Sequence, residues 1–168
     1  QGEHAKKQKQ FKNWPLASQF EFLADSIWPH YAYGKNAVYS DGHHGNAILS
    51  RYPILSFENI NISTNRFEQR GLLHAEIVIP TTDKRIHLLC VHLNLLEGGR
   101  QAQLKKISSR IREFVPENAP LILAGDFNDW RQTASSTLSR ELHLNEAFKN
   151  MTGSEMKIEP YLRMDGLK

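Results

Sequence analysis

Apolar runs separated by turn residues dominate the first half of the chain and predict β-strands. The clearest pair is Leu72 to Ile79 and Arg85 to Leu93, because residues 80–84 between them have the composition of a hairpin turn. Leu121 to Gly125 is a short continuous apolar run, which is typical of a strand buried on both faces. Further strands are predicted at residues 31–39, 45–50 and 54–62, with a turn at residues 40–42.

Apolar positions that recur every three or four residues predict helices, chiefly from residue 98 onward. The clearest helix begins at Gly98 and ends before Pro116, and its apolar stripe consists of Leu104, Ile107, Ile111 and Phe114. Shorter helices are predicted at residues 20–28 and 133–142, while the basic residues 1–14 are expected to form a solvated helix or loop. This order of elements predicts one mixed α/β (α+β) domain.

Composition limits the class of protein. Apolar residues make up 40% of the 168 residues and charged residues 23%, which excludes disordered and collagen-like chains. No apolar run approaches the roughly 18 residues of a membrane span. The single cysteine, Cys90, excludes an internal disulfide and a cysteine-rich zinc site, and we expect its thiol to be buried and inert. The net charge of +3 is too small to indicate nucleic-acid binding by itself. We also expect the protein to be a monomer located in the cytoplasm.

Oxygen-bearing side chains follow the predicted strand at residues 121–125. Asp126 and Asn128 are two positions apart, so in an extended chain they project to the same side. Such oxygens suit Mg²⁺, which binds a few protein ligands together with water and substrate phosphate. The alternative is a turn in which Asp126, Asn128 and Asp129 cap the backbone, and spacing alone slightly favours this alternative.

His92 stands at the end of the strand predicted at residues 85–93. Alternation places it on the face of Leu88 and Cys90, with His87 on the opposite face. A histidine at a strand end can protonate a leaving group or neutralise a phosphate oxygen. A structural role is the more common alternative. The remaining histidines lack carboxylate or cysteine partners at zinc-ligand spacing, so no zinc site is predicted.

Three further positions are candidate binding residues. Arg70 precedes a predicted strand, and arginine binds phosphate in a bidentate manner, although a surface ion pair is the favoured alternative. Trp130 lies beside the Asp126 loop, and Tyr39 accompanies the adjacent His43 and His44, whose rings point apart on a strand. These aromatic side chains are candidates for a pocket wall; core packing is the alternative, and it is favoured more for Tyr39.

The order of four segments resembles the endonuclease/exonuclease/phosphatase superfamily, which has the deoxyribonuclease-I-like fold. These segments are Gly45–Ile54, Gln69–Leu73, Cys90–Leu93 and Leu123–Asn128. The resemblance covers about residues 30–130 and is closest to an uncharacterised bacterial branch with Gly42–Asn46 and Asp126–Trp130 in the same order. It implies a four-layer sandwich of two packed mixed β-sheets flanked by helices.

The resemblance also implies a function. Members hydrolyse phosphoesters with Mg²⁺ or Mn²⁺, and by matched position Asp126 and Asn128 would be metal ligands. Asp126 would orient or deprotonate the attacking water, and Asn128 would hold the phosphate or the metal's water shell. His92 would neutralise the phosphate or protonate the leaving oxygen. Arg70 would be a secondary phosphate contact, and we add Asn46, His44 and Trp130 as substrate-binding candidates.

The ends of the sequence depart from the family pattern. Residues 162–165 resemble a strand start whose aspartate, here Asp165, would orient a catalytic histidine later in the chain. The family's metal-binding glutamate follows an apolar strand that Glu3 lacks, and the closing Ser-Asp-His is absent. We therefore expect residues 1–168 to be a single domain that is incomplete at both ends and weakly active or inactive as given.

Two functions follow from these observations. The first is a divalent-metal-dependent phosphoesterase in the full-length protein, acting on nucleic acid, phospholipid or a small phosphoester. The alternative is a non-catalytic binding module that keeps the fold but lacks the glutamate and the terminal Asp-His.

Overall fold

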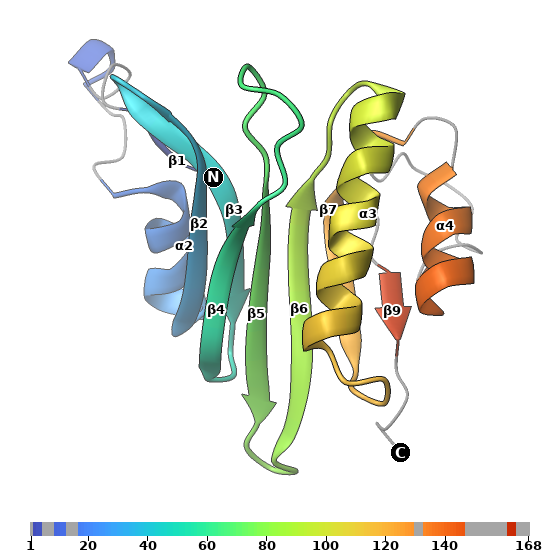
Figure 1. The fold of residues 1–168 in the computed structure, drawn as a ribbon. Helices are drawn as coiled ribbons and strands as arrows, with labels where there is room; N and C mark the ends of the chain where they lie inside the picture. The colour runs from blue at the N-terminus through green and yellow to red at the C-terminus, as the bar shows by residue number, and fades with distance from the viewer. Residues whose placement is uncertain (1, 5–8, 13–16, 130–132, 147–160, 164–168) are drawn as a thin grey trace, which may run out of the picture.

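Two β-sheets face each other in the computed structural model, with helices outside them (Figure 1). The structure describes residues 2–4, 9–12, 17–129, 133–146 and 161–163. The smaller sheet is antiparallel and has the order β1-β3-β2, with β1 at Gly2–His4, β2 at His30–Tyr39 and β3 at Gly42–Ser50. The larger sheet has the order β4-β5-β6-β7-β9-β8. Its strands are β4 (Ile54–Asn61), β5 (Gly71–Ile79), β6 (Lys84–His92), β7 (Leu121–Asp126), β8 (Asn145–Glu146) and β9 (Tyr161–Arg163).

The helices complete four layers. Helix α2 (Gln19–Ile27) lies against β2 and β3, while α3 (Glu97–Phe114) and α4 (Thr133–Leu142) lie on the outer face of the larger sheet (Figure 1). Helix α3 is the crossover between β6 and β7, which are parallel, and this makes the larger sheet mixed. The predicted α/β four-layer sandwich is confirmed. None of the described helices is long and apolar enough to cross a membrane.

Three local predictions need correction. Residues 2–4 form strand β1 instead of a solvated segment, because they pair antiparallel with residues 42–44 of β3. Gly42 belongs to β3 and not to the turn before it. Phe114 lies outside the buried apolar stripe: it is 47% exposed, and its ring contacts the guanidinium of Arg110, which lies 3.6 Å from the ring centroid.

The main hydrophobic core lies between the larger sheet and helices α3 and α4. Leu121 and Leu123 of β7 are fully buried there, and the helices contribute Leu104, Ile107, Ile111 and Leu138. Each such side chain stabilises the fold by about 1.5–3 kcal/mol when it leaves water. This packing holds β6 and β7 firmly against α3.

Side-chain amides join the two sheets where they meet. Asn46 of β3 donates from Nδ2 to the backbone oxygens of Gly71 (2.8 Å) and Cys90 (3.0 Å) in the larger sheet. Asn59 of β4 donates to the backbone oxygen of Lys35 in β2 (2.9 Å). Gly71 leaves room for these amides, because a Cβ there would stand 1.9 Å from Oδ1 of Asn36 and would displace that side chain.

A buried polar network lies on the outer face of the larger sheet. Arg110 donates from Nε to Nδ1 of His74 (3.3 Å), and Nε2 of His74 contacts Nδ1 of His87 (3.0 Å). Because Arg110 only donates, neutral His74 accepts at Nδ1 and carries its proton on Nε2. Burial, followed by the charges of His87 and Arg110, lowers the pKa of His74 from 6.5 to about 4; Glu58 and Glu76 oppose this shift.

Gly125 gives a direct test of the β7 backbone. Its φ is +147°, and a Cβ there would lie 1.9 Å from the backbone oxygen of Val91. We expect Gly125→Ala to lower the free energy of unfolding by about 2–4 kcal/mol. Gly98→Ala is the control, because nothing lies within 4 Å of a Cβ there and alanine favours the helix. Equal stabilities of the two variants in urea denaturation would contradict this account.

The His74 network predicts acid sensitivity. The folded protein holds the pKa of His74 below its unfolded value, so stability is full above about pH 6.5 and declines as the pH falls toward 4. His74→Gln should flatten this decline in urea unfolding measured across that range. His143→Asn is the control, because His143 is exposed and its positive φ of 54° suits asparagine. An unchanged slope in the His74 variant would show the assignment to be wrong.

Candidate active site

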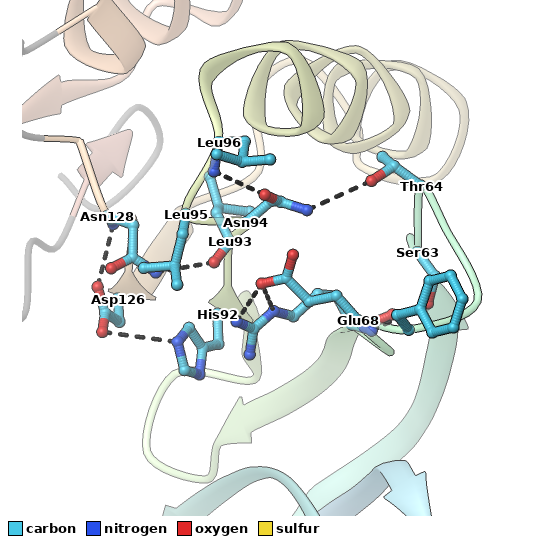
Figure 2. A network of polar contacts seen from close by, with 12 residues as sticks. Ser63, Thr64, Glu68, His92, Leu93, Asn94, Leu95, Leu96, Asp126 and Asn128 are labelled. Carbon is cyan, nitrogen blue, oxygen red and sulfur yellow. Dashed lines mark hydrogen bonds and ion pairs between the residues drawn. The ribbon is translucent and has the colours of Figure 1, made fainter.

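His92 and Asp126 stand side by side at the carboxyl ends of β6 and β7. The two strands are parallel, and His92 and Asp126 are register partners. His92 Nε2 lies 3.7 Å from Asp126 Oδ2 (Figure 2), and both side chains are about half exposed, at 45% and 46%. The structure therefore brings together the two residues that the sequence places at separate strand ends, and leaves both open to a ligand.

The turn after β7 fixes Asn128 beside Asp126. Asn128 donates its backbone N–H to Asp126 Oδ1 (3.0 Å) and its Nδ2 to the backbone oxygen of Leu93 (2.8 Å), as Figure 2 shows. Its φ of 49° is left-handed, which asparagine tolerates well. These bonds leave the amide oxygen of Asn128 as its remaining acceptor.

Asp129 has a capping role instead. Its Oδ2 accepts from the backbone N–H of Ala134 (2.6 Å), and its Oδ1 accepts from Oγ1 of Thr133 (3.0 Å), at the start of α4. The capping interpretation of this loop therefore holds for Asp129 and for the Asn128 backbone. The capping hydrogen bonds do not use Oδ2 of Asp126, which is the oxygen nearest to His92.

A hollow of about 440 Å³ opens between the sheets beside this pair, and we call it the central pocket. Four predicted residues line it: His44, Asn46, Arg70 and His92. Tyr39 also lines the central pocket and is 61% exposed, so the core-packing alternative for Tyr39 is wrong. His43 is buried, and its Nδ1 contacts the Tyr33 hydroxyl at 2.8 Å.

Arg70 combines the two roles considered for it. Its Nη2 pairs with Oε1 of Glu68 at 2.6 Å, yet its side chain, 17% exposed, also lines the central pocket. Ser63 holds the Arg70 backbone, because Arg70 N–H donates to Ser63 Oγ at 2.9 Å. Arg70 is thus a cation held in one position. Glu68 also lines the central pocket, and it is a site residue that the sequence did not reveal.

The surroundings of His92 favour its neutral form. Burial lowers the pKa of His92, and the charge of Arg70 lowers it further, while Asp126 and Glu68 oppose this shift. An anion bound in the central pocket would reverse the balance, because negative charge beside the ring stabilises the imidazolium. His92 can therefore become protonated when a phosphate binds beside it.

Polar residues of α3 hold the loop after His92, and sequence reasoning missed them. The backbone N–H of Asn94 donates to Oε1 of Gln103 (2.7 Å), and Arg100 Nη1 donates to the backbone oxygen of Leu95 (2.7 Å). Arg100 and Gln103 are almost completely buried on the same helix face as Leu104. A polar residue within an apolar helix face is the signal that could have revealed them.

The described residues fit a divalent cation as part of its ligand set. Asp126 offers a half-exposed carboxylate and Asn128 an amide oxygen, and Mg²⁺ in proteins uses one or two such groups with water and substrate oxygens. Among the described residues, no group of three or more His, Cys, Asp or Glu side chains could hold a metal. Trp130 and Asp165 lie outside the described residues, so their roles stay predictions.

Comparison with known proteins gives the family. The sequence model of the Endonuclease/Exonuclease/phosphatase family matches residues 7–153. This chain belongs to that family. It is 48% identical over 158 residues to the uncharacterised protein YbhP of Escherichia coli K12, covering 92% of this chain and 62% of YbhP. The chain thus spans less than two thirds of this relative.

Solved structures of the family share the fold. A member from Beutenbergia cavernae has a TM-score of 0.67 and 16% identity, covering 84% of this chain and 48% of that one. A mannosyl-6-phosphatase from Bacteroides thetaiotaomicron has a TM-score of 0.66 and 13% identity, covering 86% of this chain and 66% of that one. Both likenesses establish the fold.

The charges around His92 predict the direction of its pKa in two variants. Asp126→Asn removes a group that raises the pKa of His92, so that pKa should fall further, while Arg70→Gln should raise it. NMR titration of the imidazole signals measures both. Asp83→Asn, in the exposed hairpin turn, is the control and should leave the pKa of His92 unchanged. Shifts of the same sign in both active-site variants would contradict this assignment.

Proposed function

We propose that the full-length protein is a divalent-metal-dependent phosphoesterase that hydrolyses its substrate with an activated water. The observation that carries this proposal is the His92–Asp126 pair at two parallel strand ends, with Arg70 in the adjoining central pocket. Family membership supports it, because the family is named for phosphoester-cleaving enzymes. In phosphoryl transfer, catalysis depends mainly on positioning and charge stabilisation, and these side chains supply both.

Each residue has a distinct part in the proposed mechanism. Asp126 orients the attacking water and accepts its proton at Oδ2. His92, which lies 3.7 Å from that oxygen, donates from Nε2 to a phosphate oxygen or to the leaving oxygen. Arg70 balances the charge of the phosphate, and its ion pair with Glu68 keeps it in place.

The cofactor in this proposal is Mg²⁺ or Mn²⁺. Asp126 and Asn128 would hold the cation, which supplies positive charge against the phosphate oxygens. The Asn128 amide is already turned for this role, because its Nδ2 is bound to Leu93 and its oxygen is left to face a ligand.

The remaining proposed roles concern the substrate. His44 and Asn46 line the central pocket and would contact the substrate. Trp130 would form part of its wall, and Asp165 would orient a histidine. Nucleic acid, phospholipid and small phosphoesters are the substrate classes considered, and the solved mannosyl-6-phosphatase is a precedent in this fold for a sugar phosphate. A single domain, a monomer and a cytoplasmic location stay predictions.

Hydrolysis by the full-length protein tests the proposal. With Mg²⁺, it should cleave nitrophenyl phosphomonoester or phosphodiester substrates, and EDTA should abolish the activity. Asp126→Asn and His92→Ala should each lower kcat by about 10²–10⁴-fold, the usual contribution of acid–base groups. Asp83→Asn is the matched control for the carboxylate change, and His143→Asn is the control for the histidine change.

The outcomes separate the alternatives. Loss of activity in both active-site variants, with active controls, supports the assigned roles. Full activity in both active-site variants would contradict the roles assigned to Asp126 and His92. Binding of phosphoesters without any turnover by the wild-type protein would favour the non-catalytic binding module.

A further inference from the structure

We propose that a second phosphate group of the substrate binds in a hollow beside the central pocket. This inference rests on the proposed phosphoesterase function and names the class of substrate: a molecule with two phosphates close together. The hollow, which we call the donor pocket, measures about 440 Å³. Its lining includes Lys35, Arg66 and Arg70 together with Asn36, Asn61 and Asn65.

The donor pocket adjoins the central pocket. Asn36, Gln69 and Arg70 line both hollows, so Arg70 stands at their junction. A ligand with one phosphate against His92 and Arg70 can therefore reach the donor pocket with a second group. The shared lining makes the two hollows parts of one surface that a single substrate can span.

The charge of the donor pocket selects an anion. Among the described residues that line it, three have cationic side chains and none has a carboxylate. Arg70 is paired with Glu68, which lines the central pocket, but within the described part of the chain neither Lys35 nor Arg66 has an ion-pair partner. The guanidinium of Arg66 lies 4.7 Å from the ring centroid of Phe67. Lysine and arginine together are common ligands of phosphate.

Two asparagines of the donor pocket, Asn61 and Asn65, present donors because their oxygens are already bound. Asn61 Oδ1 accepts from the backbone N–H of Ser63 (2.8 Å). Asn65 Oδ1 accepts from the backbone N–H groups of Phe67 and Glu68, each at 2.9 Å. Backbone N–H groups only donate, so these amides cannot be reversed, and the hydrogen bonds of the described residues leave each NH₂ group for a ligand.

Of the other two amides in the lining, Asn36 agrees with this reading and Asn59 does not contribute a donor. Asn36 Oδ1 accepts from Nδ2 of Asn59 at 3.0 Å, which leaves the Asn36 NH₂ as the free end. Asn59 spends its NH₂ group on the backbone oxygen of Lys35 and on Asn36 Oδ1, and its own Oδ1 is buried without a hydrogen-bond partner among the described residues. That oxygen lies at the junction of the sheets, where a Cβ on Gly34 or Gly71 would stand within 2.8 Å of it. The donor pocket thus combines N–H donors with positive charge, as a phosphate requires.

A binding experiment tests the donor pocket without turnover. Pyrophosphate, which carries two linked phosphates, is titrated into the metal-free full-length protein and followed by NMR. We expect the side-chain NH₂ signals of Asn61 and Asn65 to shift together with the His92 imidazole. Lys35→Gln/Arg66→Gln should weaken pyrophosphate binding at least tenfold, because it removes two cations and the loss of one charge-assisted contact alone corresponds to about tenfold.

The control carries the same charge change elsewhere. Arg51→Gln/Lys105→Gln alters two exposed cations outside both pockets and should leave pyrophosphate affinity unchanged. Shifts of His92 without shifts of Asn61 and Asn65 would overturn the inference. Equal weakening by both double variants would also overturn it, because net charge alone would then explain binding.

A kinetic experiment distinguishes the two sources of a second phosphate. One arm compares a dinucleotide with and without a 5′-phosphate, and the other compares a hexose 1,6-bisphosphate with the hexose 6-phosphate. We expect kcat/KM to be about tenfold higher for the doubly phosphorylated substrate in one of the two arms, and that arm identifies the source of the second phosphate. Lys35→Gln/Arg66→Gln should remove this preference.

The failures of the two proposals remain separate. Turnover without preference in either arm would overturn the second-phosphate inference and leave the phosphoesterase intact. Absence of all turnover would count against the phosphoesterase, while pyrophosphate shifts at Asn61 and Asn65 would still support the donor pocket.

Discussion

The parallel pairing of β6 with β7 sets the geometry of the active site, because its last register pair is His92 with Asp126. A shift by one residue would turn one of these side chains to the opposite face of the sheet. The register is held by Leu121 and Leu123, which are buried against α3, and by Gly125, whose conformation admits no side chain beside Val91. Core packing under the strands therefore positions polar groups at their ends.

The smaller sheet contributes substrate contacts only because it is tied to the larger one. Asn46 uses its Nδ2 group on the backbone oxygens of Gly71 and Cys90, one in each of two neighbouring strands. Two backbone acceptors are thereby satisfied at the junction, and Asn46 is fixed where it lines the central pocket together with His44 and His92. A change in the contact between the sheets would alter the pocket even if every strand remained intact.

The sequence predicted most strands and helices because their apolar periodicity is local. The proximity of His92 and Asp126 is also predictable from the sequence, since parallel strands end at the same edge of a sheet and the family resemblance implies a role for both residues. Strand β1 was missed because residues 2–4 gain their structure from pairing with β3, about forty positions away. The donor pocket was missed for a related reason: the free NH₂ groups of Asn61 and Asn65 depend on which backbone groups their oxygens meet in the folded loop.

Two histidines show how the same direction of pKa shift serves different ends. Burial and a nearby arginine lower the pKa of both His74 and His92. His74 is enclosed, and its ring is bound by Arg110 and His87, so protonation can only weaken the fold. His92 has a half-exposed side chain beside an open pocket, so an arriving phosphate can offset the charge of Arg70 and restore its affinity for a proton. Access to a ligand, and not the shift itself, is what separates a reactive histidine from a structural one.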